Sequence, residues 1–286
     1  MGKQRRGRSE RDTIGYLTEA KMQDMAKTLN ARDYEILKLL DRFRCMSSEQ
    51  IYKLVPSIDG LDAFSELSTG KDRCNKRLRM LFDNHFINKY SPLLGVGEGT
   101  SKQYCWLDKV GKYILTGDIS AKSKKNIPPD YLHCSAVVDM FIYFKHLNEI
   151  KPGTVRYFRN ENKQATALLI PDITVALNIN DKPRLFFIEI DRGNNKESAE
   201  VSKLRKYDDW KNGYLWKQEE WAKLIDNCPF PDMIFCVDDE MKYHKSRITR
   251  INKAVSGYNM NIIFTTFSTI VDDVDYFVNC NEYVHN

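Results

Sequence analysis

Two strand-like runs in the second half of the chain carry acidic residues at positions that could do chemistry together. The runs span residues 169–177 and 184–191, and the polar pair Asn180-Asp181 separates them. If that pair supplies the two central residues of a β-hairpin turn, the strands pair residue for residue around it. Asp172 would then lie directly opposite Glu189.

Asp191 is a third acidic residue of the same pattern. Side chains alternate along a strand, so Asp191 should share a face with Glu189. Clustered carboxylates repel one another, and a divalent cation or basic neighbours would relieve that repulsion. The basic candidates are Arg192, Lys203 and Lys206. We therefore take Asp172, Glu189 and Asp191 as a candidate site for a divalent cation or for basic neighbours such as Lys203.

A second constellation is basic and lies on a predicted helix over residues 69–84. Its apolar residues share one face, which consists of Cys74, Leu78, Leu81 and Phe82. Arg73 and Lys76 point the opposite way, and Arg77 and Arg79 flank them. A helix that packs on one side and offers several cations on the other suits the DNA major groove. A single basic helix face is also compatible with plain solvation.

The elements around this helix have the order of a winged helix. Residues 31–44 show helical spacing, and Ser47 with Gln50 forms a capping box that begins a second helix. Two strand-like runs, residues 86–90 and 103–107, follow the basic helix and are joined by a glycine-rich tip. The tip would let Lys102 reach the sugar-phosphate backbone. The predicted DNA contacts are Lys71, Arg73, Lys76, Arg77, Arg79, Lys102, Arg5 and Arg6.

The elements around the acidic residues resemble the restriction-endonuclease-like core. We expect strands at 154–158, 169–177, 184–191 and 233–237, and helices at 197–210 and 214–226. The resemblance implies a Pro-Asp, then (Asp/Glu)-x-Lys motif, to which Pro171-Asp172 and Glu189-Ile190 correspond. The resemblance implies that Asp172, Glu189 and Asp191 would be catalytic, with Asp172 and Glu189 as ligands for Mg²⁺ or Mn²⁺. Asp191 occupies the lysine position, so the catalytic lysine would come from elsewhere, such as Lys203. A working magnesium site and a non-catalytic domain that contacts DNA or a partner both remain open.

Composition and charge bound the remaining possibilities. The 286 residues carry a formal net charge of +5, and a basic arm that includes Arg5 and Arg6 could neutralise phosphates. Apolar runs are too short to span a bilayer, so we expect a cytoplasmic protein that makes no membrane contact. The predicted fold class is mixed α/β. The predicted division is a basic arm (1–30), a winged helix-turn-helix (31–118), a linker (119–129) and a restriction-endonuclease-like domain (130–286).

Both halves together resemble the replication-relaxation family of plasmids and mobile elements, over about residues 31–215. The resemblance is carried by residues 31–37, Arg77-Leu78-Arg79, Tyr104-Trp106-Leu107, Pro171-Asp172, residues 187–193 and residues 203–207. The Glu189-Ile190-Asp191-Arg192-Gly193 segment is the most specific part. The resemblance implies a role in replication control or transcription regulation on a plasmid or mobile element, with replication or transfer proteins as further partners. The basic helix and the wing predict sequence-specific binding of double-stranded DNA, as a homodimer because paired half-sites raise the affinity. No cofactor is required for such binding; the alternative is a magnesium-dependent endonuclease or nickase.

Overall fold

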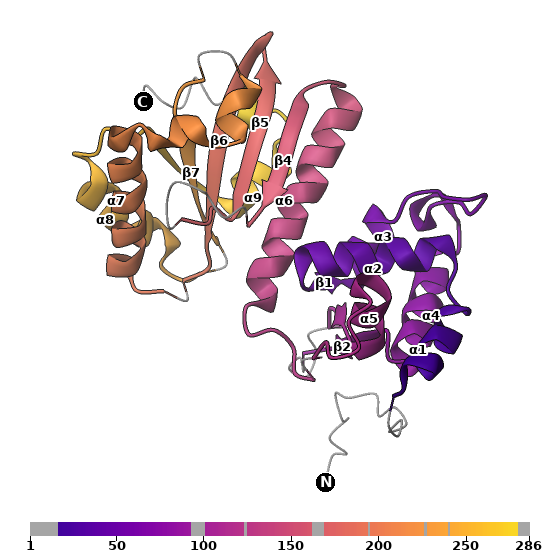
Figure 1. Cartoon of the computed structure of the whole chain (residues 1–286). Helices are drawn as coiled ribbons and strands as arrows, with labels where there is room; N and C mark the ends of the chain where they lie inside the picture. The colour runs from indigo at the N-terminus through magenta and orange to yellow at the C-terminus, as the bar shows by residue number, and fades with distance from the viewer. Residues whose placement is uncertain are drawn as a thin grey trace. The chain divides into compact units, whose positions relative to one another are not determined.

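The computed structural model describes residues 17–92, 101–122, 125–161, 169–193, 195–225, 228–239 and 241–279. The chain divides into two compact units, residues 1–138 and 139–286. The boundary falls within the long helix α6 (Tyr131–Ile150), so residues 131–138 of that helix belong to the first unit. Helices and sheets both occur, which confirms a mixed α/β fold (Figure 1). Among the described residues, no helix has the length and apolar character needed to cross a membrane.

The first unit combines helices with a small antiparallel sheet. Its helices are α1 (Glu19–Ala26), α2 (Ala31–Phe43), α3 (Ser48–Leu54), the 3₁₀ turn η1 (Phe64–Glu66), α4 (Gly70–Asp83) and α5 (Lys109–Thr116). Its strands are β1 (Met46–Ser47), β2 (Ile87–Tyr90) and β3 (Tyr104–Leu107), arranged in the order β1-β3-β2. The predicted hairpin is confirmed, because β2 and β3 pair antiparallel. The tip between them, residues 93–100, lies outside the described residues.

Local sequence signals explain where these helices begin. The Ser47 hydroxyl accepts from the Gln50 amide at 3.2 Å, and the Gln50 side chain accepts from the Ser47 amide at 2.8 Å. This reciprocal pair is the predicted capping box, and α3 begins at the next residue. Thr69 precedes α4, but its hydroxyl accepts from no backbone amide, so α4 begins without a side-chain cap at Thr69. The predicted apolar face of α4 is buried: Cys74, Leu78, Leu81 and Phe82.

Part of the predicted arm is helical. Residues 1–16 lie outside the described residues, but α1 occupies Glu19–Ala26 within the stretch expected to be an arm. The Thr18 hydroxyl caps this helix, and Met22 is completely buried. The Gln23 side chain contacts the Tyr113 hydroxyl of α5 at 3.2 Å. With one buried apolar residue, α1 carries too little periodicity to be recognised in the sequence.

The second unit contains a five-stranded sheet in the order β4-β5-β6-β7-β8. The strands are β4 (Val155–Asn160), β5 (Ile173–Ile179), β6 (Lys182–Asp191), β7 (Asp232–Val237) and β8 (Ile262–Thr266). β4, β5 and β6 pair antiparallel, whereas β6, β7 and β8 pair parallel. The parallel pairs are joined through α7 (Glu197–Gly213) and α8 (His244–Val255), and α9 (Phe267–Asp272) and α10 (Tyr276–Asn279) follow β8.

The register of the β5–β6 hairpin confirms the sequence prediction. Ile173 pairs with Ile188, and Ile179 pairs with Lys182, so the turn residues are Asn180 and Asp181. Both turn residues have positive φ, 50° and 60°, as a two-residue type I′ turn requires. The register carries Asp172 to the position opposite Glu189, one residue beyond the paired ladder.

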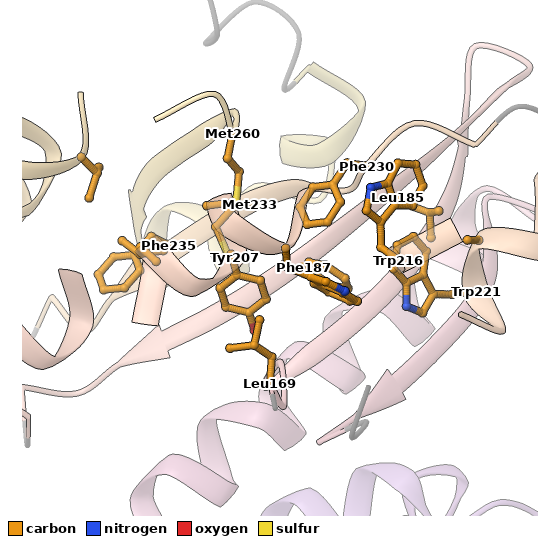
Figure 2. Packing of buried hydrophobic residues seen from close by; sticks show 14 of the residues in the cluster. Leu169, Leu185, Phe187, Tyr207, Trp216, Trp221, Phe230, Met233, Phe235 and Met260 are labelled. Carbon is orange, nitrogen blue, oxygen red and sulfur yellow. The ribbon is translucent and has the colours of Figure 1, made fainter. Parts of the chain in front are cut away.

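Helices cover both faces of this sheet (Figure 1). On one face, Phe187 packs against Tyr207 and Trp210 of α7. Figure 2 shows Phe187, Tyr207, Met233 and Phe235 within this buried cluster, which α8 joins through Ile251 and Val255. On the other face, Phe186 of β6 contacts Phe277 of α10, which also contacts α6. Glu189 and Asp191 alternate with Ile188 and Ile190, so both point to the α7–α8 face.

The helix predicted at residues 214–226 was wrong. Tyr214 adopts a left-handed conformation (φ 57°) that ends α7, and two 3₁₀ turns follow, η2 (Leu215–Gln218) and η3 (Trp221–Leu224). Trp216 and Trp221 are both buried and stack with an interplanar angle of 3°. In one continuous helix, residues five apart would point about 140° away from each other. The break between the turns therefore lets both indoles enter the same core.

Candidate nucleic-acid interface and acidic cluster

The acidic cluster is built from β5, β6 and α7. The Asp172 carboxylate immediately precedes β5 and accepts a hydrogen bond from the Ile190 amide at 2.7 Å. Glu189 is 2% exposed, and its carboxylate contacts both the Lys203 ammonium and the Tyr207 hydroxyl, the latter at 2.5 Å. Lys203 and Tyr207 are one helical turn apart on α7, so both reach the same carboxylate. The structure thus brings together Asp172, Glu189 and Lys203, as predicted, and adds Tyr207.

Burial and charge shift the pKa values of this cluster. Burial, followed by the repulsion of the Asp172 carboxylate, raises the pKa of Glu189 to about 8, although Lys203 and Tyr207 oppose the shift. Burial alone would lower the pKa of Lys203, but the Glu189 and Asp172 carboxylates outweigh it and hold that pKa above its ordinary value. Burial also raises the pKa of Tyr207, and Glu189 reinforces the shift. Lys203 therefore keeps its proton, while the pKa of Glu189 stays raised because Lys203 and Tyr207 only partly offset its burial and the charge of Asp172.

Asp191 does not join this cluster in the way we expected. Its carboxylate accepts from the Arg247 guanidinium of α8 at 2.5 and 3.1 Å, and from the Gly193 amide at 2.8 Å. Arg247 and Asp191 are both buried. Arg247 lies 56 residues away in the chain, and no local pattern indicates that it turns inward. The buried Arg247 thus neutralises Asp191 and offsets the repulsion that we expected between Asp191 and the other acids.

The next two residues of the same segment also make specific contacts. The Arg192 guanidinium pairs with Asp238 at 2.9 Å, just after β7. Gly193 has a φ of 73°, and a Cβ atom there would come within 2.3 Å of the Met241 side chain. The positive φ favours glycine here, whereas the end of the flexible Met241 side chain could shift to admit a Cβ. Residues 189–193 therefore join the ends of β6 and β7 to α7 and α8.

The fit of this cluster to a divalent cation can be tested on its oxygen atoms. Both Glu189 oxygens accept hydrogen bonds from protein donors, and one Asp172 oxygen accepts from a backbone amide. The Asp191 carboxylate forms an ion pair with Arg247. Throughout the part of the chain that the structure describes, no three His, Cys, Asp or Glu residues are grouped to hold a metal. Mg²⁺ prefers near-octahedral oxygen ligands. The residues as arranged do not supply such a site, and we derive no metal-dependent step.

The predicted reading face of α4 carries exposed cations. Arg73 and Lys76 are exposed, and within the described ranges neither forms a salt bridge. Arg77 has a different role: its guanidinium makes a two-pronged contact with Asp33, which is completely buried, and also donates to the Thr28 carbonyl at 3.1 Å. Asp33 closes the capping box of α2. Arg77 therefore fixes α4 against α2 and is not available as a reader.

A groove of about 300 Å³ lies beside α4 on the side of α2. It is lined by Asn30, Arg32, Phe64, Arg73, Lys76, Arg77 and Met80. The Arg32 guanidinium lies over the Phe64 ring, 4.4 Å from its centroid. Its Nη2 donates to the Asp62 carbonyl at 2.5 Å, while its buried Nε has no hydrogen-bond partner among the described residues. This side of α4 therefore adds Arg32 to the predicted cations.

A larger groove, about 560 Å³, separates α4 from the hairpin; we call it the hairpin groove. It is lined by Ser47, Ser48, Glu49, Asn75, Arg79, Lys89, Ser91, Ser101, Lys102 and Gln103. Two predicted residues, Arg79 and Lys102, meet here although 23 positions separate them in the chain. Lys89 is the residue that the sequence did not single out. Burial lowers its pKa, so this partly desolvated ammonium gains from a nearby anion.

The remaining predicted contacts lie elsewhere. The Lys71 ammonium sits 5.7 Å from the centroid of the Tyr52 ring, at the start of α4. Arg79 is 77% exposed and lies 3.7 Å from Asp83, one turn further along the helix. Arg5 and Arg6 fall outside the described residues. Lys89 could have been found from its place in the strand of the predicted hairpin, close to where its tip begins.

Comparison with solved structures finds a weak likeness to the restriction endonuclease FokI. The free enzyme aligns with a TM-score of 0.32 at 13% identity, and the DNA-bound enzyme with 0.31 at 12%. These alignments cover 88% and 87% of this chain but only 45% and 44% of FokI, so the chain spans less than half the length of that enzyme. A likeness of this size carries no conclusion about activity. No curated protein matches the chain.

The sequence pattern of one family matches most of the chain. The match covers residues 37–224, which include α4, the hairpin, the acidic cluster and all of α7. Residues 189–193 and the basic helix α4 both lie within the matched range. The chain therefore belongs to the replication-relaxation family.

Proposed function

We propose that this protein binds double-stranded DNA in a sequence-specific manner and that α4 is its reading helix. The observation that carries the proposal is the cationic lining of α4 on both sides. Arg73 and Lys76 are exposed without ion pairs in the described ranges, and Arg79, Lys89 and Lys102 converge in the hairpin groove. Phosphates flank both sides of a helix that enters the major groove. The cations of α4 and the hairpin match that distribution of charge.

The finer architecture belongs to the same proposal. The element order α2, β1, α3, α4, β2, β3 is that of a winged helix, with the β2–β3 hairpin as the wing. The order α6, β4, β5, β6, α7, β7 suits a restriction-endonuclease-like core whose catalytic role has been lost. We propose that the protein acts in the cytoplasm as a homodimer, in replication control or transcription on a plasmid or mobile element. Replication or transfer proteins are its proposed further partners.

Affinity measurement on a selected duplex tests the reading helix. Replacing Arg73 and Lys76 together by alanine should weaken binding by several kcal/mol, at about 1–3 kcal/mol for each specific base contact. Lys109→Ala together with Lys125→Ala, which removes two lysines outside α4 and the hairpin, is the matched control and should have little effect. Unchanged affinity in the Arg73→Ala, Lys76→Ala variant would remove α4 as the reader.

A metal-dependent endonuclease is the second candidate, and one observation favours it. The Lys203 ammonium reaches Glu189 beside Asp172, so a lysine does stand next to the two acids despite Asp191 at the usual lysine position. The pairing of Asp191 with Arg247 argues against it, because the third acid is neutralised. Binding without cleavage remains the interpretation that the cluster supports better.

Plasmid nicking separates the two candidates. We expect little or no nicking of supercoiled DNA with Mg²⁺ or Mn²⁺, because the arranged residues lack a complete metal site. The assay compares the wild-type chain with Asp172→Asn and Lys203→Ala. Robust nicking that both substitutions abolish would establish the nuclease and overturn the non-catalytic assignment.

A further inference from the structure

The helix α8 in the second unit has an unusual distribution of charge. Residues 241–271 contain no aspartate or glutamate, and α8 itself carries four lysines and arginines. The neighbouring α7, in contrast, carries four basic and four acidic residues. Acidic residues usually accompany basic ones on a solvated helix face. The absence of acids from the sequence of α8 therefore calls for an explanation beyond solubility.

The side chains of α8 divide into a fixed set and an open set. Arg247 is buried against Asp191, and Arg250 is paired with both carboxylate oxygens of Glu197 at 2.9 and 3.0 Å. Lys245 and Lys253 are exposed, and within the described ranges neither forms an ion pair. They lie two helical turns apart on one stripe, with the exposed Thr249 between them. The stripe spans about 12 Å at 1.5 Å per residue.

Lys242 extends this cationic surface just before the helix begins. It is exposed, and its ammonium lies 5.2 Å from the centroid of the Tyr243 ring, which is 64% exposed. Lysines together with hydroxyl groups of serine, threonine and tyrosine are among the side chains that bind phosphate oxygens. Ser246 and Thr249 are also exposed on α8, but their hydroxyls donate to the Tyr243 and Lys245 carbonyls at 3.0 Å. The lysines are therefore the phosphate-binding groups of this face.

The family's most specific segment holds α8 in place. Asp191 binds Arg247, the Asn195 carbonyl accepts from the same guanidinium at 2.9 Å, and Gly193 makes room for Met241 just before α8. These contacts fix the inner side of α8 while its outer lysines stay open. The chemistry of a nuclease need not be invoked for these residues, because their contacts position a surface helix.

We propose that the stripe of Lys242, Lys245, Thr249 and Lys253 is a second DNA-contacting surface that binds the phosphate backbone without reading sequence. This inference rests on the proposed function of α4, since it assigns the second unit to the same duplex-binding task. Nucleic acid is favoured over an acidic protein because repeated phosphates match a run of cations, and the exposed ring beside them, Tyr243, lies at the end of the run. Protein interfaces instead have an apolar core. Two linked surfaces raise the affinity of a chain for one polymer without new base contacts.

Salt dependence of binding by the full chain tests this surface. The slope of log affinity against log salt is negative, and the variant Lys245→Gln, Lys253→Gln should make it less steep by about 1.8. Each phosphate that is no longer neutralised accounts for about 0.9 of that change. The reduction should be equal on a selected duplex and on an unrelated one. The matched control is Lys182→Gln, Lys223→Gln, which removes two exposed lysines elsewhere in the second unit and should leave the slope unchanged. Thermal unfolding of each variant verifies that the fold is intact.

The outcomes separate this inference from the proposed function. If the α8 variant has the slope of the wild-type chain, or if it matches the control, the second surface is ruled out while α4 is unaffected. If the α8 variant lowers the ratio between selected and unrelated affinities, the stripe reads sequence and the inference is wrong. The Arg73→Ala, Lys76→Ala variant is measured alongside. If the Arg73→Ala, Lys76→Ala variant binds the selected duplex as tightly as the wild-type chain, while the α8 variant shows the reduced slope, sequence reading by α4 is ruled out and the second surface is not.

Discussion

Several charged residues that the sequence marked as candidate ligand contacts instead form ion pairs or hydrogen bonds with one another. Arg77 neutralises the buried Asp33, Arg247 neutralises Asp191, and Lys203 with Tyr207 occupies Glu189. Buried charges persist only when they are paired in this way. Such pairs specify the arrangement of helices, and the exposed Arg73 and Lys76, which form no salt bridge within the described ranges, are the residues that we propose to contact DNA.

Arg77 provides a test of this division between structural and binding cations. Arg77→Ala leaves Asp33 buried without its main partner, which should lower the free energy of unfolding by about 3 kcal/mol. Arg79→Ala, two positions along the same helix and largely exposed, should change it by less than about 0.5 kcal/mol. Urea denaturation measures both. Equal effects of the two substitutions would contradict the structural role of Arg77.

The raised pKa of Glu189 makes stability depend on pH. The folded chain holds a proton on Glu189 up to a pKa of about 8, whereas the ordinary value is 4.5. Between these values the unfolded chain binds fewer protons, so the contribution of Glu189 to stability falls as the pH rises from 4.5 to about 8. One proton corresponds to a slope of at most about 1.4 kcal/mol per pH unit.

The comparison of the wild-type chain with Glu189→Gln isolates that contribution. Glutamine cannot titrate, so the variant should lack the downward component of the stability curve across this pH window. Urea unfolding at several pH values measures the difference between the two chains. If the two stability curves run parallel, Glu189 does not titrate as described.

At the scale of elements, the sequence specified those features that follow from local chemistry. The α3 capping box, the apolar face of α4 and the β5–β6 register all depend on residues a few positions apart, and all three are confirmed. Features that depend on distant partners could not be predicted in this way. The pairing of Asp191 with Arg247 and the break at Tyr214 both depend on the packed core. β1, with two residues, is too short for any pattern.

The hairpin is an element whose role can be tested separately from α4. Lys89→Gln together with Lys102→Gln should make the negative slope of log affinity against log salt less steep by about 1.8, because each lysine is expected to contact one phosphate. The reduction should be the same on selected and unrelated duplexes, since backbone contacts carry no sequence information. Fluorescence anisotropy titrations over a range of salt concentrations give the slope. A slope identical to that of the wild-type chain would exclude the hairpin groove as a phosphate site.

At the scale of the whole molecule, each of the two units has its own part in the proposed DNA binding. The first unit carries the reading helix and the hairpin groove, and the second carries a charged cluster that holds α7 and α8 around the sheet. Family membership fits either a binder or a nuclease. The neutralised third acid and the open cations of α4 favour the binder, in which both units contribute to holding DNA.

Selection from a random duplex library with the full-length chain tests this account most directly. Sequencing the retained duplexes after several rounds should show one enriched motif for the wild-type chain. The Arg73→Ala, Lys76→Ala variant should retain DNA weakly and enrich no motif, because its backbone contacts remain while its base contacts are removed. Failure of the wild-type chain to enrich any motif, or enrichment of the same motif by the variant, would contradict sequence-specific reading by α4.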